Sequence, residues 1–196
     1  MKSFLNKRIL IYLLKFIGAF CFFYFGTLAV IGLSSPVGYY SGFVDSYLNF
    51  IPFFRLTLLN GTKAFVYLFG YESYIPINTQ IRLVNGGGVN LVYSCIGYGV
   101  TSFWLAFVFA NQGSFKKKLV WMLGGSLLIW IINVLRISLV LLSNGNKLKI
   151  PFNIDNHTLF NIAAYIAIFG MIYFFDKSGK QYLKAKKQDD GFKQIQ

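Results

Sequence analysis

Two apolar runs of membrane-spanning length constrain this sequence most, because each follows a cluster of positive charge. The first, Ile9–Leu33, contains Lys15 as its only charged residue, and the second, Leu119–Leu142, follows Lys116–Lys118. At about 1.5 Å of rise per residue, helices of these lengths can cross about 30 Å of hydrocarbon. The chain is 56% hydrophobic and 13% charged, with a mean hydropathy of +0.55. These features predict an all-α integral membrane protein.

Two shorter apolar runs, Cys95–Ala110 and Thr158–Phe175, extend the prediction to a bundle of about four to six transmembrane helices. Residues 43–71 are rich in aromatic side chains but carry several charges, including Arg55. We interpret this segment as an amphipathic helix in the outer membrane interface. Two short tilted crossings are the alternative interpretation.

A β-hairpin is predicted between this segment and the second half of the chain. Two β-type stretches, residues 79–84 and 89–93, flank a turn formed by Gly86–Gly88. A hairpin has unpaired edges, so we expect it to lie in water or against protein on the extracytoplasmic side, and not in lipid.

The distribution of positive charge predicts the orientation in the membrane. Cytoplasmic loops carry an excess of Lys and Arg, so we place the N-terminus, the Lys116–Lys118 loop and the C-terminus in the cytoplasm. Residues 1–180 then form one membrane-embedded domain, and residues 181–196 form a basic cytoplasmic tail. The net charge of +13 does not indicate nucleic-acid binding, because the basic residues lie in short clusters between apolar runs.

This topology brings a cysteine, an arginine and a histidine to one face of the bilayer. Cys95 begins one apolar run at the outer face, and His157, the only histidine, precedes another at the same face. Arg136 lies about 12 Å below the end of its run by helix rise, and its long side chain can reach upward. We therefore expect the three side chains to meet just beneath the extracytoplasmic surface.

These three side chains predict thiol chemistry. Cys95 is the candidate nucleophile, because the free amide groups and positive dipole end of a helix N-terminus stabilise a thiolate. His157 is the candidate general acid and base, which takes the thiol proton and returns it to a leaving amine. Arg136 is costly in a membrane unless it is paired or lines a polar cavity, and it could bind the developing oxyanion or a substrate carboxylate.

Three further residues support this candidate site. Gly97 removes side-chain bulk next to the cysteine, so that a substrate backbone could approach. Asn133 is three residues before Arg136 and shares its helix face. Asp155 is a candidate to orient the histidine that follows it by two residues.

Structural roles are the alternative for each of these residues. A lone cysteine in a membrane helix is usually structural, and we give Cys21 that interpretation. A histidine at a membrane boundary can be simply interfacial, and an arginine inside a span can snorkel and anchor its helix. One histidine and two cysteines are too few for a self-contained zinc site, and we predict neither a metal nor another cofactor.

At these residues the sequence resembles the exosortase/archaeosortase family of membrane-embedded cysteine transpeptidases. The family pattern is an extended stretch, Cys-x-Gly at the opening of a helix, Asn-x-x-Arg within the next helix, and a His at the start of another. Cys95–Gly97, Asn133–Arg136 and His157 match this pattern in that order. The resemblance extends over roughly residues 74–175.

The chain departs from the family pattern at three points. Ile96 stands where the family usually has Ser after the Cys, and Tyr93 and Ser94 stand where an acidic residue often precedes it. The chain is also much shorter than the large exosortases. The resemblance therefore implies a small variant of the family.

What the resemblance implies is a reaction at the bacterial cytoplasmic (inner) membrane. Substrates of the family are secreted proteins with a C-terminal sorting signal, which consists of a short motif, a transmembrane helix and a basic tail. The enzyme cleaves near the motif through a cysteine thioester and transfers the new C-terminus to an envelope acceptor nucleophile. The implied partners are these secreted proteins, that acceptor and membrane lipid.

Two other classes of function stay open. One is a non-catalytic membrane subunit of an envelope export or polysaccharide assembly system, in which the polar face through Asn133 would contact another subunit. The other is a small transporter, which is less well supported because the sequence shows no second intramembrane charge for a relay and no inverted repeat.

Overall fold

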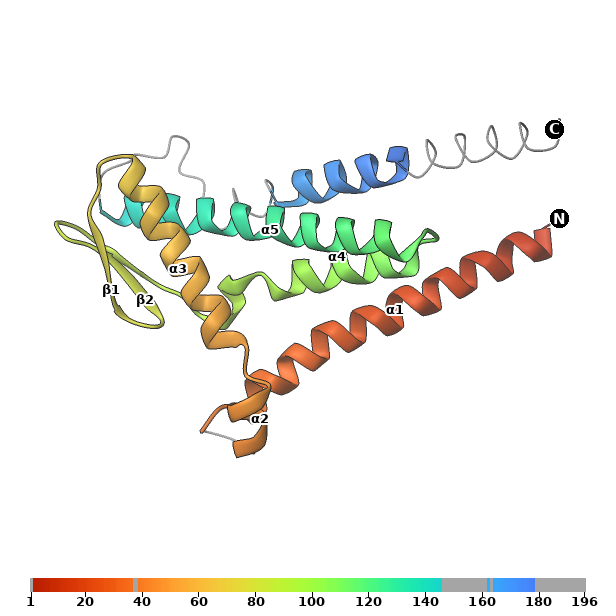
Figure 1. Ribbon diagram of the computed structural model, residues 1–196, viewed down its shortest axis with the longest axis horizontal. Coiled ribbons are helices and arrows are strands. Elements are labelled where there is room, and N and C mark those ends of the chain that lie inside the picture. Colours follow the sequence, from red (N-terminus) through yellow and green to blue (C-terminus); the bar gives the residue numbers. More distant parts are fainter. Residues whose placement is uncertain (1, 37–38, 146–161, 163, 179–196) are drawn as a thin grey trace.

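The protein is mostly helical in the part of the chain that the structure describes. The computed structural model describes residues 2–36, 39–145, 162 and 164–178. Helix α1 (Lys2–Leu33) runs along α4 (Tyr98–Ala110), which lies beside α5 (Phe115–Asn144) and the helical residues 164–178 (Figure 1). A short helix α2 (Gly42–Tyr47) and a longer helix α3 (Ile51–Leu68) follow α1, and α3 crosses α5 obliquely.

Two described helices are long and apolar enough to cross a membrane. They are the segment Ile9–Leu33 of α1 and the whole of α5, Phe115–Asn144. Both long runs predicted from the sequence are therefore confirmed as continuous helices. Helix α4 has 13 residues, which corresponds to about 20 Å, so it is shorter than the run Cys95–Ala110 had indicated.

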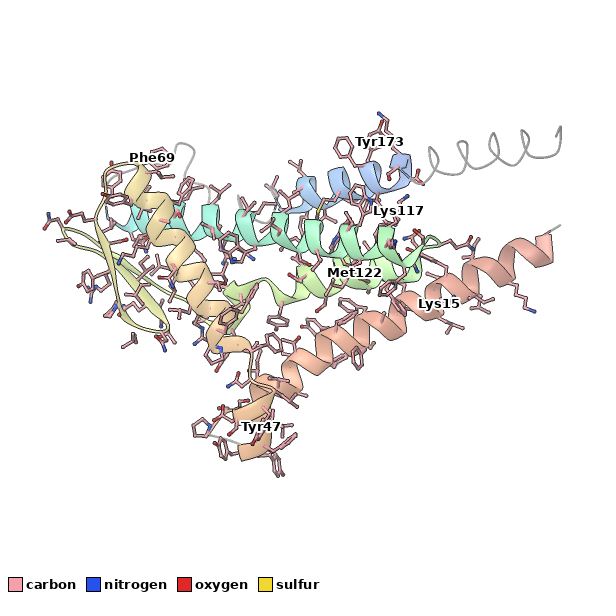
Figure 2. All side chains as sticks on the ribbon, in the orientation of Figure 1. Lys15, Tyr47, Phe69, Lys117, Met122 and Tyr173 are labelled. Carbon is pink, nitrogen blue, oxygen red and sulfur yellow. The ribbon has the colours of Figure 1, made fainter. Side chains whose placement is uncertain are left out.

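Helices α4 and α5 and residues 164–178 lie lengthwise in the molecule, with a small sheet at one end (Figure 1). Helix α4 ends at Ala110 and α5 begins at Phe115, so the two helices run in opposite directions. The beginning of α1, the beginning of α5 and the end of residues 164–178 lie at the end of the molecule opposite the sheet (Figure 1). Lys117 lies at that end (Figure 2). Its Nζ is 5.4 Å from the centroid of the Phe175 ring.

Helix α3 is amphipathic, as predicted for residues 43–71. Its buried residues recur at helical spacing and include one charged side chain; they are Ile51, Arg55, Leu58, Leu59, Thr62 and Val66. Residues three, four and seven apart share one face of a helix, so a single face of α3 packs inward. The position of this helix relative to a membrane stays a prediction.

The predicted hairpin is confirmed, and a third strand joins it. Strand β2 (Gln80–Leu83) pairs antiparallel with β3 (Gly88–Asn90), with Ile81 opposite Val89. Strand β1 (Ser73–Ile77), which the sequence did not predict, pairs with the other edge of β2. The register of β1 shifts between Tyr74 and Ile77, where Pro76 has no N–H to donate, and edge strands are where proline is tolerated.

The sheet packs against α3 and the C-terminal end of α5. Its inward residues Ile81 and Leu83 join a buried cluster with side chains from both helices, among them Leu58, Val66 and Leu141. The glycine turn lies so close to α5 that a Cβ on Gly87 would be 2.5 Å from the carbonyl oxygen of Asn144. The sheet therefore lies against protein, as its unpaired edges had led us to expect.

A second apolar cluster lies toward the other end of the molecule. It joins α4, α5 and residues 164–178 through Trp104, Ile129, Met171 and Phe175. The indole N–H of Trp104 donates to the carbonyl of Trp121 at 2.9 Å. The candidate site lies in a partly exposed turn between the two clusters.

Candidate active site

Cys95 lies in a single turn of 3₁₀-helix, Tyr93–Ile96, between the sheet and α4. Its amide donates to the carbonyl of Val92 at 2.9 Å, and its side chain is half-buried. Gly97 follows with φ of 81°, and α4 begins only at Tyr98. The prediction that Cys95 itself begins an α-helix is therefore wrong by three residues, because the glycine in the left-handed conformation separates the turn from the helix.

The structure brings Arg136 of α5 to the cysteine. Nη2 of Arg136 donates a hydrogen bond to Sγ of Cys95 at 3.2 Å, across a sequence separation of 41 residues. Both side chains are only partly buried. Hydrogen bonds are stronger when the donor or the acceptor is charged, so a guanidinium that donates to sulfur stabilises negative charge on that sulfur. The predicted meeting of these two residues is thus present in the fold.

Asn133, which lies three residues before Arg136 on α5, holds the Cys95 turn in place. Its side-chain N–H donates to the carbonyl of Ile96 at 3.2 Å, and the side chain is 1% exposed. Its Oδ1 has no hydrogen-bond partner within the described residues. Asn133 therefore fixes the backbone immediately after Cys95.

Gly97 has a structural role beside the one suggested by the sequence, which stays a prediction. A Cβ at this position would overlap Nδ2 of Asn133, and the left-handed backbone itself disfavours other residues. The space into which a Cβ would project is thus filled by Asn133, while Gly97 also lines a neighbouring cavity. The glycine serves the attachment of the turn to α5.

A cavity of about 230 Å³ lies beside this turn. Its walls come from α1, α4, α5 and residues 164–171, and most of them are apolar. Its polar lining includes Tyr24, Ser94, Tyr98, Asn133 and Arg136. Arg136 therefore contacts Cys95 and also faces a space that could receive part of a ligand.

The tyrosines of this cavity were not identified from the sequence. Tyr24 of α1 and Tyr98 of α4 face each other with ring centroids 5.4 Å apart. Tyr98 directly follows Gly97 of the cysteine motif, so its position in the sequence could have indicated it. Tyr24 lies in an apolar run with no local pattern to distinguish it. Only the packing of α1 on α4 reveals its position.

Arg55 is a second arginine at the cysteine turn, and the sequence analysis did not assign it to the site. It belongs to the buried face of α3, is 8% exposed, and its guanidinium carbon lies 4.8 Å from the ring centroid of Tyr93. A signal was present in the sequence, because Arg55 has the helical phase of Ile51, Leu58 and Leu59. A charge in phase with an apolar face indicates burial.

His157 and Asp155, the predicted general acid/base and its orienting residue, lie outside the described residues. Their predicted roles therefore stay predictions. The described part of the site consists of the Cys95 thiol, the guanidinium that donates to it, and the Asn133 amide that fixes the backbone after Cys95. Such an arrangement is suited to stabilising negative charge on sulfur and on an oxygen nearby.

Comparisons of the chain with protein-family profiles, with curated proteins and with solved structures found no match.

Proposed function

We propose that the protein is a membrane-embedded cysteine transpeptidase or protease. Its substrates are secreted proteins that end in a short motif, a transmembrane helix and a basic tail. It cleaves them at the outer face of the bacterial cytoplasmic membrane and transfers the new C-terminus to an envelope acceptor. In this proposal Cys95 is the nucleophile, Arg136 stabilises charge and His157 carries the proton.

The observation that carries the proposal is the 3.2 Å hydrogen bond from Arg136 to Sγ of Cys95. An arginine within an apolar helix is costly unless it is paired or functional. A guanidinium directed at a thiol is also a means of activating a cysteine nucleophile, because the thiolate is the reactive form. The order of the Cys, Asn, Arg and His motifs in the sequence supports the same chemistry.

The reaction would proceed through a thioester. The thiolate of Cys95 attacks the carbonyl carbon of the scissile peptide, and the C–N bond breaks as His157 gives a proton to the leaving amine. The released fragment carries the transmembrane helix and basic tail of the substrate. An amine of the acceptor, or water, then attacks the thioester and returns the thiol.

Two helices of sufficient length and apolarity support the membrane location. Further support comes from the apolar side chains of α1 that face outward, such as Leu14, Phe22 and Phe25, which are 64%, 74% and 58% exposed. An outward apolar surface of this kind fits lipid better than water. A substrate helix in the same bilayer could then reach the Cys95 turn by lateral diffusion.

The two cysteines provide a matched test. A secreted protein with the tripartite C-terminal signal, encoded in the same genome, is co-expressed with the wild-type protein, with Cys95→Ala or with Cys21→Ala. We expect Cys95→Ala to abolish processing and Cys21→Ala to retain it, with all three proteins at equal levels in the membrane fraction. Cleavage is measured by mass spectrometry of the secreted protein, as the decrease in its mass when the C-terminal helix and tail are removed.

A covalent intermediate would test the mechanism directly. In the wild-type protein, supplied with substrate but no acceptor, we expect hydroxylamine to intercept the thioester between Cys95 and the substrate and to convert the new C-terminus into a hydroxamate. Normal processing by Cys95→Ala would contradict the proposal and would favour a non-catalytic subunit.

A further inference from the structure

Arg55 is the most deeply buried cation that the described part of the chain places near the candidate site. It is 8% exposed, and its Nε has no hydrogen-bond partner among the described residues. No ion pair joins it to a described carboxylate. Removing a charge from water costs several kcal/mol unless a partner compensates, so this guanidinium is suited to an anionic partner.

The contact of Arg55 with Tyr93 places this charge at the cysteine turn. The guanidinium carbon lies 4.8 Å from the Tyr93 ring centroid, and Tyr93 is the first residue of the four-residue turn that contains Cys95. A cation–π contact at such a distance contributes less than the burial of a charge costs. The contact therefore orients Arg55 without accounting for its burial.

The two arginines approach the turn from different helices. Arg136 of α5 donates to Sγ of Cys95, and Arg55 of α3 covers Tyr93 two residues earlier. Helices α3 and α5 are locked together nearby, because Trp130 donates to Oγ1 of Thr57 at 3.2 Å. A Cβ on Gly61 would also lie 2.9 Å from the ring of Trp130. The separation of the two positive charges is thus set by helix packing.

We propose that Arg55 forms an anion subsite beside Cys95, which binds a carboxylate of the segment attacked by the thiol. Arg136 would act on the sulfur and the reacting carbonyl, and Arg55 would select an acidic group on the Tyr93 side of the turn. That this acidic group belongs to a polypeptide substrate rests on the proposed function. The anion subsite itself does not require that function.

Alkylation of Cys95 tests the subsite without a known substrate. Iodoacetate and iodoacetamide both form an S–C bond as iodide leaves, but only iodoacetate carries a carboxylate. The full-length protein with Cys21→Ser leaves Cys95 as the sole thiol. The measurement is the ratio of the two alkylation rates by mass spectrometry, in protein reconstituted in lipid.

Arg55→Gln is expected to lower the iodoacetate/iodoacetamide rate ratio by about 5- to 10-fold, as expected for the loss of one nearby positive charge. Arg55→Lys should keep most of the ratio, because it keeps the charge. The matched control is Lys63→Gln, which removes an exposed charge from another face of α3, and it should leave the ratio unchanged.

Two results would overturn the proposal. If Arg55→Gln slows both reagents equally, Arg55 only positions the turn. If Arg55→Gln and Lys63→Gln change the ratio equally, the effect belongs to the overall charge and not to a site. Neither result depends on peptidase activity, so a failure here is distinguishable from retained processing by Cys95→Ala.

Discussion

Helices α1 and α5 have the same mean hydropathy, 2.1, over their most apolar segments, but they occupy different environments in the fold. None of that segment of α1 is buried inside the protein, whereas 44% of that of α5 is buried. Helix α1 touches the rest of the molecule mainly along α4, through contacts such as Phe16 with Phe103 at 5.5 Å between ring centroids. Helix α5 contacts α3, α4 and the sheet.

The difference between these helices lies in their polar residues. In α5 the side chains of Asn133 and Arg136 donate to groups on the distant Cys95 turn. In α1 the hydroxyl of Thr27 donates to the carbonyl of Phe23 on its own helix at 2.8 Å. Apolarity therefore identifies both helices, while the long-range bonds of its polar residues distinguish the helix that builds the site.

The largest difference should appear when leucines of the two helices are shortened. Leu141 of α5 is 0% exposed and Leu14 of α1 is 64% exposed. We expect Leu141→Ala to lower the free energy of unfolding by about 2–5 kcal/mol through lost burial and a cavity. Leu14→Ala should change it by less than about 0.5 kcal/mol. Thermal unfolding of the purified proteins in detergent measures both, and equal losses would show that α1 is also packed.

The cations of the two helices provide the next comparison. Arg136→Gln removes the donor to Cys95 and should reduce processing by about 100- to 1,000-fold, as does loss of one charge-stabilising donor in an active site. Lys15→Gln removes an exposed cation from α1 and should leave processing within about twofold. The measurement is the initial rate of substrate cleavage, and an equal loss in the two variants would remove Arg136 from the site.

Glycines distinguish the turn held by α5 from the open surface of α1. Gly97 has φ of 81° and lies against Asn133, while a Cβ on Gly26 would meet nothing within 4 Å. Gly97→Ala should destabilise the protein by about 1–3 kcal/mol, whereas Gly26→Ala should be neutral or slightly stabilising in a helix. Thermal unfolding is again the measurement. A tolerated alanine at Gly97 would contradict the described backbone of the turn.

The smallest expected effect concerns the hydrogen bonds of the two helices. Asn133→Leu removes the long-range bond to Ile96 and should lower the free energy of unfolding by about 0.5–1.5 kcal/mol. Thr27→Val removes only a bond within α1. Its effect should be close to zero, because that bond joins Thr27 to its own helix and to no other element. Chemical unfolding in mixed micelles resolves the difference, and a larger loss at Thr27 would reverse the comparison.

Prediction from sequence succeeded where the pattern is local. The two long helices, an amphipathic helix within residues 43–71 and the β2–β3 hairpin all follow from periodicity, turn residues and charge. Strand β1 was missed because Pro76 argues against a strand, and the edge position that permits proline is a tertiary property. The start of α4 was missed because a single glycine conformation separates it from the Cys95 turn.

The sequence by itself determined that the chain forms long apolar helices, and that Cys95 and Arg136 lie in segments able to approach each other. Only the tertiary structure decided that Arg136 bonds to the sulfur, that Asn133 fills the space beside Gly97, and that Arg55 lies buried over Tyr93. The physical reason is that helical periodicity and hydropathy act over a few residues and specify which face is apolar. The partner of each polar group is set by how helices far apart in the sequence pack against one another, with crossing geometry and side-chain volume choosing among faces of similar apolarity.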